Sequence, residues 1–350
     1  MSINDLSRYS RQIRFSALGE VGQRKLLASK VLVCGCGALG THLAEQLARA
    51  GVGKMKLIDR DFVDWSNLQR QVLFTEQDVQ ECLPKAIAAQ RHLQGINSEV
   101  SVEAEVLDLD SGNIENYLNG IDLILDGTDN FETRYLINDV SIKYKIPWVF
   151  GGCLGAEGQM MPILPKKSAC LRCLFPEPPA AGDTPTCDSA GILASIIGVV
   201  ASMQVLEAIK ILSGNLEVVN PYLTMIDLWG NRTQQLRCPR RSGELEHQTA
   251  CPTCGPEAEF PWLEGKKSAR SQVLCGRNSV QISPPEGKGF DLDQLAAQLS
   301  SLGSVQRNPF LLRFQAEKWQ LTIFPDGRTI IKGTEDLSEA KSVFTRFVGL

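Results

Sequence analysis

One segment, Lys30–Asp59, has in order the features of a strand, a glycine turn, a helix, a second strand and a terminal carboxylate. The β-branched run Lys30–Cys34 leads directly into Gly35-Cys-Gly-Ala-Leu-Gly40, whose G-x-G-x-x-G spacing is typical of a turn between a strand and a helix. In such a turn the first glycine permits the bend, the second leaves room for a phosphate, and the third lets the helix pack close to the sheet. Free amides at the helix start hold anionic oxygens. The segment therefore predicts a nucleotide site in a parallel α/β sheet.

The second strand of this unit, Lys54–Ile58, ends in Asp59, where a carboxylate accepts hydrogen bonds from ribose hydroxyls. The candidate nucleotide contacts of the turn itself are Gly35, Gly37, Ala38 and Gly40. A lone G-x-G-x-x-G is weak evidence, and by default it indicates an NAD-dependent oxidoreductase. Motifs in other parts of the chain are needed to distinguish an NAD-dependent oxidoreductase from an enzyme with another nucleotide chemistry.

Three further polar groups follow this unit. The stretch from Arg60 to Gln71, which includes Ser66, Asn67 and Arg70, is too polar for a core and rich in donors, so it is a candidate phosphate-contacting segment. Lys85 follows Pro84 at the start of a predicted helix, which puts an ammonium near the same face of the sheet. Asp129 follows the buried strand Ile121–Asp126, at the strand end where ligands of α/β sheets bind. The alternative is that Thr128 or Asp129 only caps the next helix.

The chain has eleven cysteines, and four of them form two C-x-x-C pairs. Cys170 and Cys173 form one pair, and Cys251 and Cys254 form the other. Four thiolates match a closed, tetrahedral and therefore structural Zn²⁺ site. The alternatives for either pair are a redox dithiol or a chance occurrence of the spacing.

Composition excludes several classes of function. The net charge is −4 and there is no basic block, which argues against a nucleic-acid partner. There is no uninterrupted apolar run of ~18 residues and the N-terminus is polar, so we expect no membrane association and a cytoplasmic location. The apolar helix predicted over Ile192–Leu212 fits a buried bundle or a dimer interface. Only three histidines are present, none in a motif, which argues against histidine-based catalysis.

The order of these patterns predicts an α/β fold. We expect a Rossmann-like, doubly wound and mostly parallel sheet, with antiparallel strands at Trp148–Cys153 and Gln159–Leu164 in its second half. Residues 1–255 would form the nucleotide-binding domain with its zinc site. Residues 256–350 would form a small α+β domain without a catalytic constellation.

Taken together, the motifs resemble the ThiF/MoeB/HesA adenylyltransferases, which are relatives of the ubiquitin-activating enzymes. The resemblance covers roughly Leu6–Gly255. The matching pieces stand in the family's order: Arg8-Tyr-Ser-Arg11-Gln12, Gly35–Gly40, Asp59, Ser66–Gln71, Pro84-Lys85, Asp126–Asn130, Gly158-Gln159, Cys170 with Cys173, Thr186-Cys187, Ile197–Ser202, Glu207–Lys210, and Cys251 with Cys254. It implies that ATP activates the C-terminal glycine carboxylate of a small ubiquitin-like sulfur-carrier protein as an acyl adenylate, with release of pyrophosphate.

The resemblance also implies roles for individual residues. Asp59 would bind the ribose, and Asp129 would lie at the Mg²⁺ or phosphate end. The other expected nucleotide contacts are Ser66, Asn67, Arg70, Lys85 and Asn130. Such chemistry needs cations but no general base, because the attacking carboxylate is already ionised. Ala38 departs from the glycine that close relatives often carry there.

Two further residues stand out by the resemblance. Arg11 matches an arginine that reaches into the site of the neighbouring subunit, which implies a homodimer. Cys187 precedes the apolar helix, where the helix dipole lowers a thiol pKa. In some relatives the matching cysteine forms a covalent sulfur link with the carrier or with a sulfur-donor protein, and in others it is dispensable, so both interpretations stay open.

The C-terminal part of the chain indicates which branch of the family it resembles. Val273–Ile282, Asn308–Phe314 and Phe324–Thr334 resemble the extension of ThiF-type enzymes, which implies sulfur transfer for the thiazole of thiamine. MoeB-type activation of a MoaD-like carrier is the alternative within the family. An NAD-dependent dehydrogenase explains neither Ser66–Gln71 nor the paired C-x-x-C. A nucleotide-binding scaffold without turnover would not need Arg70, Lys85 and Asp129 together.

Overall fold

The computed structural model describes residues 6–179, 190–241, 250–267, 271–274, 278–282 and 289–349. The chain divides into two compact units, the first comprising Met1–Pro179 and Ile192–Ser268 and the second comprising Ala180–Gly191 and Ala269–Leu350. Each unit has its own sheet and its own hydrophobic core.

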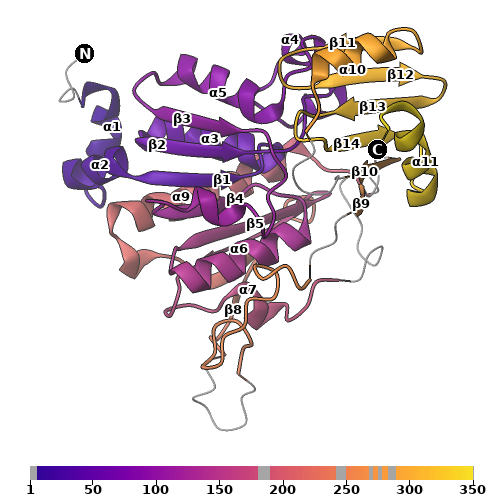
Figure 1. Ribbon diagram of the computed structural model, residues 1–350. Coiled ribbons are helices and arrows are strands. Elements are labelled where there is room, and N and C mark those ends of the chain that lie inside the picture. The colour runs from indigo at the N-terminus through magenta and orange to yellow at the C-terminus, as the bar shows by residue number, and fades with distance from the viewer. Residues whose placement is uncertain are drawn as a thin grey trace. The chain divides into compact units, whose positions relative to one another are not determined.

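The frame of the first unit is an eight-stranded sheet in the order β3-β2-β1-β4-β5-β6-β7-β8 (Figure 1). Strands β1 to β5 pair in parallel, and β5 to β8 pair antiparallel. The strands are β1 Lys30–Cys34, β2 Lys54–Ile58, β3 Ser101–Glu105, β4 Leu123–Asp126, β5 Trp148–Leu154, β6 Glu157–Ile163, β7 Tyr222–Asp227 and β8 Arg232–Arg237. The expected Rossmann-like, mostly parallel sheet with antiparallel strands in its second half is confirmed.

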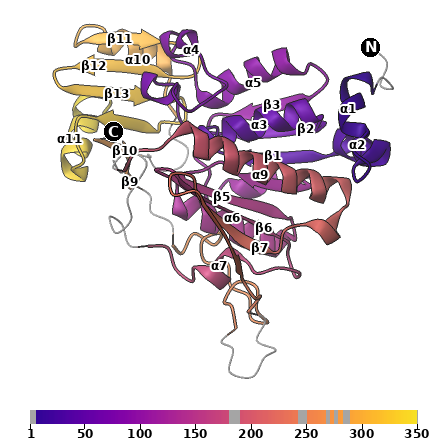
Figure 2. The same ribbon diagram turned by 180° about the vertical axis from the view of Figure 1, so that it is seen from behind.

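Helices cover both faces of this sheet. The described helices of the first unit are α1 Ser10–Ile13, α2 Gly19–Ala28, α3 Ala38–Ala50, α4 Glu76–Gln80, α5 Lys85–Ile96, α6 Phe131–Tyr144, α7 Leu171–Leu174 and α9 Ala194–Ser213, with short 3₁₀ turns between some of them. Helices α3, α5 and α9 share one core with the sheet, and α6 shares the other. Figure 1 shows α6 in front of the sheet, and Figure 2 shows α9 on the opposite face.

Strand β1 lies in the middle of the sheet and is buried on both faces. Val31 and Val33 belong to the core with α3 and α9, whereas Leu32 and Cys34 belong to the core with α6. A continuous apolar run is what a central parallel strand between two helical layers requires. The glycine turn directly follows this strand and therefore lies at the carboxyl edge of the sheet.

The second unit is built on a six-stranded antiparallel sheet in the order β11-β12-β13-β14-β10-β9. Its elements are β9 Ser271–Leu274, β10 Ser279–Ile282, α10 Leu292–Leu299, β11 Ser304–Arg307, β12 Leu312–Ala316, β13 Trp319–Ile323, β14 Thr329–Lys332 and α11 Leu337–Phe347. Helix α11 begins where Asp336 accepts a hydrogen bond from the Glu339 amide, and it buries Ala340, Val343 and Phe344 at helical spacing. The expected small α+β fold is confirmed.

The first unit extends beyond Gly255, the end of the first domain in the sequence analysis. Trp262 and Leu263 are buried in the core shared with α6. Their backbone amides donate to Oδ2 of Asp139 on α6, at 3.0 and 3.4 Å. Trp262 also packs against Tyr135, with ring centroids 4.5 Å apart. These contacts join the segment after the second C-x-x-C pair to the first unit.

Candidate active site and cysteine cluster

The glycine turn is shaped by close approach of backbone segments. Gly35 has φ +87°, and a Cβ at Gly35 would lie 2.7 Å from the carbonyl oxygen of Gly127. A Cβ at Gly40 would lie 1.9 Å from the carbonyl oxygen of Gly35. At Gly37 the nearest such atom is 3.9 Å away, so this residue has open space beside it. Helix α3 begins at Ala38. The turn therefore has room for a ligand at the second glycine and at the helix start.

Asp59 holds the glycine turn from the end of β2. Its Oδ2 accepts a hydrogen bond from the Cys36 amide at 2.6 Å, and its Oδ1 accepts one from the Asp61 amide at 2.7 Å. Burial raises the pKa of Asp59, while the positive charge of Lys85 lowers it. Each carboxylate oxygen has a second lone pair, so this fixed carboxylate can still accept ribose hydroxyls.

Lys85 lies at the start of α5 and forms a buried ion pair with Asp61. The Lys85 Nζ is 3.0 Å from Asp61 Oδ2, and the Lys85 amide donates to the Asp61 carbonyl oxygen at 2.9 Å. Only 4% of the Lys85 side chain is exposed. A buried ammonium needs a partner of opposite charge, and Asp61 supplies it. Asp61 lies in the predicted phosphate-contacting segment 60–71, but its pairing with Lys85 was not predicted; its D-x-D spacing from Asp59 was the available signal.

Arg60 and Asp108 form a second ion pair that sequence reasoning missed. Arg60 Nη1 lies 3.1 Å from both oxygens of Asp108. Burial lowers the pKa of Arg60, but the negative charges of Asp108, Asp61 and Asp129 outweigh it and raise that pKa. Asp129 therefore contributes to the same electrostatic field as the residues that follow β2. No pattern in the sequence points to Asp108.

The segment that contains Ser66, Asn67 and Arg70 begins with a 3₁₀ turn over Trp65–Asn67. Asp64 caps it: Asp64 Oδ1 accepts from the Ser66 amide and hydroxyl, and Asn67 Oδ1 accepts from the Asp64 amide. Arg70 Nη1 donates to the Ser66 carbonyl oxygen at 2.7 Å. Asn67 is buried, while Ser66 is exposed. These donors are thus fixed on one locally ordered turn.

Asn130, not Thr128 or Asp129, caps helix α6. Asn130 Oδ1 accepts a hydrogen bond from the Glu132 amide at 2.8 Å. Thr128 instead donates to the Asp126 side chain, and Asp129, between Thr128 and Asn130, is exposed. The alternative that Thr128 or Asp129 only caps the helix is therefore wrong for both residues.

Arg11 does not join the other predicted residues within one chain. It is exposed on α1, and its neighbour Gln12 donates to the carbonyl oxygen of Ala50, the last residue of α3, at 3.0 Å. Helix α3 has 13 residues, so the glycine turn lies roughly 20 Å from this contact. Cys187 lies outside the described residues.

The four cysteines of the two C-x-x-C pairs come together. Their sulfur atoms all lie within 4.8 Å of one another, with Sγ to Sγ distances of 3.6 Å for Cys170 to Cys251 and 3.4 Å for Cys173 to Cys254. Zinc–sulfur bonds of about 2.3 Å in a tetrahedron put sulfur atoms about 3.8 Å apart, so the cluster fits Zn²⁺ in size and donor type. The predicted grouping of these cysteines is confirmed, and the group could hold a metal ion.

Arg172, which lies between Cys170 and Cys173 in the sequence, connects the two halves of this cluster. Its Nη1 donates to Thr253 Oγ1 at 3.0 Å, and its guanidinium lies over the Trp262 ring at 4.8 Å. Thr253 lies between the second two cysteines. One side chain therefore joins both C-x-x-C turns, which sequence spacing did not indicate.

Among the described residues, one helix, α9, has the length and apolar composition needed to cross a bilayer. More than half of its apolar stretch is buried against other parts of the protein. Ile196, Val200 and Ala201 lie in the core shared with α3. Such burial is typical of a core helix.

The fold and the site define a class: a Rossmann-type nucleotide-binding protein with a cysteine cluster beside its sheet. The ThiF family pattern matches residues 9–253, which is most of the chain. The chain belongs to the ThiF family, as the order of its motifs predicts.

Known relatives extend the comparison beyond the family pattern. The chain is 43% identical over 343 residues to the sulfur carrier protein ThiS adenylyltransferase of Bacillus subtilis (strain 168), covering 98% of this chain and 99% of that protein. It is 37% identical to the protein of the same name from Escherichia coli (strain K12), covering 73% of this chain and 97% of that one. A sulfur carrier protein adenylyltransferase of Thermus thermophilus is 38% identical, over 72% of this chain and 92% of its own length.

A solved structure of E. coli MccB has a similar fold. It has a TM-score of 0.62 and 23% sequence identity, covering 73% of this chain and 75% of that chain. At this identity the likeness concerns the fold alone.

Proposed function

We infer that the chain is an adenylyltransferase that uses ATP to activate the C-terminal glycine carboxylate of a ThiS-like sulfur-carrier protein in thiamine biosynthesis. The observation that carries this inference is the 43% identity to a ThiS adenylyltransferase over 98% of the chain, which takes in both compact units. The matched relatives named for adenylyltransferase and sulfurtransferase activity are covered over only 51% to 60% of their length, with 51% for one from Culex quinquefasciatus and 60% for one from Anopheles gambiae.

The cations of the site suit this reaction. The carrier carboxylate attacks the α-phosphorus of ATP, and negative charge builds up as pyrophosphate leaves. Lys85 and Arg70 would stabilise that charge, while Asp59 holds the ribose. Bound Mg²⁺, held by Asp129, would neutralise charge on the leaving phosphates. Ser66, Asn67 and Asn130 would complete the nucleotide contacts around the glycine turn.

In a homodimer, Arg11 of one subunit would complete the nucleotide site of the other subunit. Arg11 lies on α1, which contacts the end of α3 that is farther from the glycine turn of the same chain, so Arg11 could serve only the site of a partner subunit. C2 dimers are the commonest oligomers, and they make such an exchange reciprocal. We assign Cys187 either to a covalent sulfur intermediate, with a sulfur-donor protein as a further partner, or to no catalytic role.

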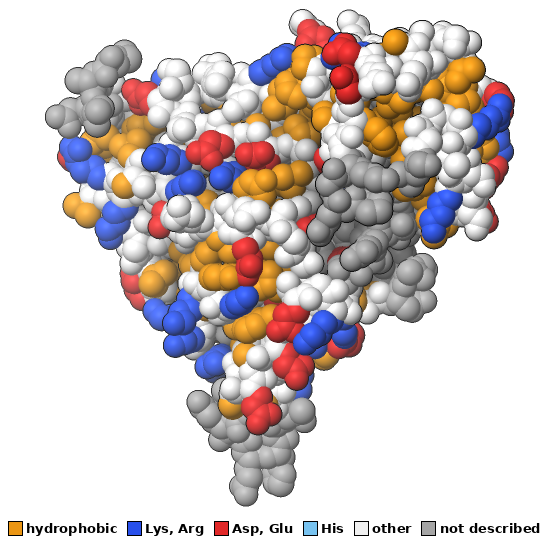
Figure 3. Space-filling model, in the orientation of Figure 1, with side chains coloured by type: hydrophobic (Ala, Val, Ile, Leu, Met, Phe, Trp, Pro, Cys, Tyr) orange, Lys and Arg blue, Asp and Glu red, His pale blue; other side chains and the backbone are white. Residues whose placement is uncertain are grey.

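The remaining assignments concern the surroundings of the reaction. Zn²⁺ in the cysteine cluster would be structural, because four thiolates leave no open coordination position. The part of the second unit that follows Ser268, Ala269–Leu350, would assist recognition of the carrier, and the protein would act in the cytoplasm. Basic and acidic side chains are interspersed on the face shown in Figure 3, and together with the net charge of −4 this argues against a nucleic-acid partner.

Carrier-dependent ATP–pyrophosphate exchange tests this function. The full chain should exchange pyrophosphate with a ThiS-like carrier and Mg²⁺, and it should do so faster than with a MoaD-like carrier. The same carrier without its last glycine is the matched control and should be inert. Absence of exchange with any Gly-Gly-ended carrier would overturn the proposal, and faster exchange with the MoaD-like carrier would reassign the substrate.

A further inference from the structure

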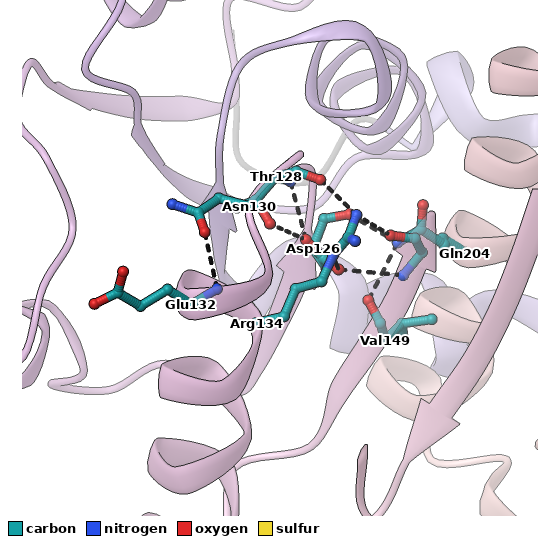
Figure 4. A network of polar contacts seen from close by, with 8 residues as sticks. Asp126, Thr128, Asn130, Glu132, Arg134, Val149 and Gln204 are labelled. Carbon is teal, nitrogen blue, oxygen red and sulfur yellow. Dashed lines mark hydrogen bonds and ion pairs between the residues drawn. The ribbon is translucent and has the colours of Figure 1, made fainter. Parts of the chain in front are cut away.

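A buried arginine on α6, Arg134, joins the turn that carries Asp129 to the neighbouring strand (Figure 4). Its Nε donates to Asp126 Oδ2 at 3.0 Å, and its Nη2 donates to the carbonyl oxygens of Thr128 at 2.7 Å and Gly151 at 3.1 Å. The Asp126 side chain is fully buried, and 8% of the Arg134 side chain is exposed. The guanidinium thus spans the end of β4, the following turn and β5.

We propose that Arg134 is a positioning residue for adenylylation, which holds Asp129 in place through the peptide bond before it. The Thr128 carbonyl that Arg134 binds belongs to the peptide that links Thr128 to Asp129. The other side of Thr128 is fixed as well, because its amide and hydroxyl both donate to Asp126 Oδ1, at 2.9 and 2.7 Å. The direction in which the chain enters Asp129 is therefore set by the Asp126–Arg134 pair. The proposal rests on the proposed function, in which Asp129 serves the nucleotide phosphates.

The same turn is in direct backbone contact with the glycine turn. A Cβ at Gly127 would lie 2.6 Å from the carbonyl oxygen of Gly35 and 2.8 Å from the Cα of Gly40. The Gly127 amide donates to the Cys34 carbonyl oxygen at 2.9 Å. A displacement of the Asp126 turn would therefore be transmitted to the phosphate-binding turn.

Gln204 fixes the other side of this arrangement from helix α9. Its Nε2 donates to the carbonyl oxygens of Asp126 at 3.0 Å and Val149 at 3.1 Å. Its amide lies so close to Gly151 that a Cβ there would be 2.5 Å from it. Gln204 is fully buried. The Asp126 turn is thus held from α6 by Arg134 and from α9 by Gln204 (Figure 4).

Stability alone does not explain the buried ion pair between Asp126 and Arg134. Replacing a buried ion pair with apolar residues of similar volume is often neutral or stabilising, because desolvation offsets the attraction between the charges. The geometry of Arg134 offers a more specific role, since a planar guanidinium fixes several acceptors at once. Lysine keeps the charge and loses this planar set of donors.

The test compares full-length variants in the ATP–pyrophosphate exchange assay. Arg134→Lys should lower kcat by ~100-fold, the scale of an ångström-sized misplacement, while the KM for ATP stays within about threefold. Lys143→Ala is the matched control, because Lys143 is an exposed cation of the same helix that pairs with Glu115. It should keep wild-type kcat.

A second variant keeps the test valid if Arg134→Lys fails to fold. The double variant Asp126→Asn with Arg134→Gln leaves no unpaired buried charge, so its Tm should return toward the wild-type value while kcat stays low. A kcat that recovers together with Tm would overturn the proposal, as would an Arg134→Lys protein with kcat within threefold of wild type. A wild-type protein without exchange would instead overturn the proposed function.

Discussion

The Nζ of Lys85 lies 3.0 Å from Oδ2 of Asp61, and both side chains are largely enclosed by the protein. The pair joins the start of α5 to the segment after β2. A charge held in this way needs no rearrangement when negative charge develops nearby. Asp61 therefore determines where the ammonium of Lys85 points.

The first prediction concerns this pair. Lys85→Ala should reduce carrier-dependent pyrophosphate exchange by at least ~100-fold, because it removes a charge-stabilising donor. Asp61→Asn should also reduce kcat, by a smaller factor, because the ammonium remains but loses its partner. Lys54→Ala, which removes an exposed lysine from β2, is the control and should leave the rate unchanged. An Asp61→Asn protein with wild-type kcat would show that the orientation of Lys85 does not depend on Asp61.

The second prediction concerns the cysteine cluster. Purified, reduced protein should contain one zinc per chain, because Cys170, Cys173, Cys251 and Cys254 bring four sulfurs within 4.8 Å of one another. Cys251→Ser should lose the zinc and lower Tm, since metal binding contributes to folding free energy. Cys82→Ser, at a cysteine outside the cluster, should keep the zinc. Substoichiometric metal in fresh wild-type protein would argue against a zinc site.

The third prediction concerns Arg11. Arg11→Ala and Arg70→Ala proteins should each be inactive, and a mixture should regain part of the activity. A hybrid dimer places one Arg11 and one Arg70 in the same site, so it carries one intact site. Subunit exchange has to be verified with differently tagged chains. If exchange occurs without any recovery, each site is built within one chain.

The fourth prediction concerns pH and Asp139. Burial raises the pKa of Asp139 to about 7, although the amides of Leu263 and Trp262 lower it. The folded protein therefore binds this proton more tightly than the unfolded chain, whose carboxyl titrates near 4. The stability that this group contributes is present at low pH and is lost as pH rises toward 7.

Asp139→Asn removes this titration and keeps a carbonyl oxygen for the two amides. The Tm of Asp139→Asn relative to wild type should therefore be higher at pH 8 than at pH 5. Calorimetry at both pH values measures it. An equal difference at the two values would show that Asp139 is ionised throughout this range.

The fifth prediction concerns the C-terminal unit. A chain that ends at Ser268 keeps Trp262 and Leu263 on Asp139, so it should remain folded and retain zinc and ATP binding. Its apparent KM for the carrier should rise. A chain that ends at Gly255 is the comparison, and it should have a lower Tm because it lacks the buried Trp262. Loss of ATP binding in a folded 1–268 protein would place the second unit in the nucleotide site.

Local patterns predicted much of the fold and of the candidate site. The glycine turn and Asp59 belong to one strand-turn-helix-strand unit, so a short stretch of sequence carries their spacing. The cysteine pairs were recognisable for the same reason, because each C-x-x-C is local and two pairs together match a metal site. The antiparallel half of the sheet followed from short strands around a glycine-rich turn.

Contacts between residues that are far apart in the sequence were not predictable in this way. Asp61 and Lys85 are 24 residues apart, and Arg60 and Asp108 are 48 apart. Arg134 looks like an ordinary polar residue of a helix, and only the packing of α6 on β4 turns it toward Asp126. The end of the first unit depended likewise on one tertiary contact, between Trp262 and Asp139.

The meeting of Gly127 with Gly35 and Gly40 involves only atoms that every amino acid shares. An alanine scan, which shortens most side chains, would instead lengthen each of these three residues by a methyl group. Each added methyl group would collide with backbone atoms of another of the three glycines, so we expect the three alanine substitutions to have similar effects. Attempts to change the nucleotide preference of this enzyme should therefore leave these glycines alone and vary the residues that follow β2.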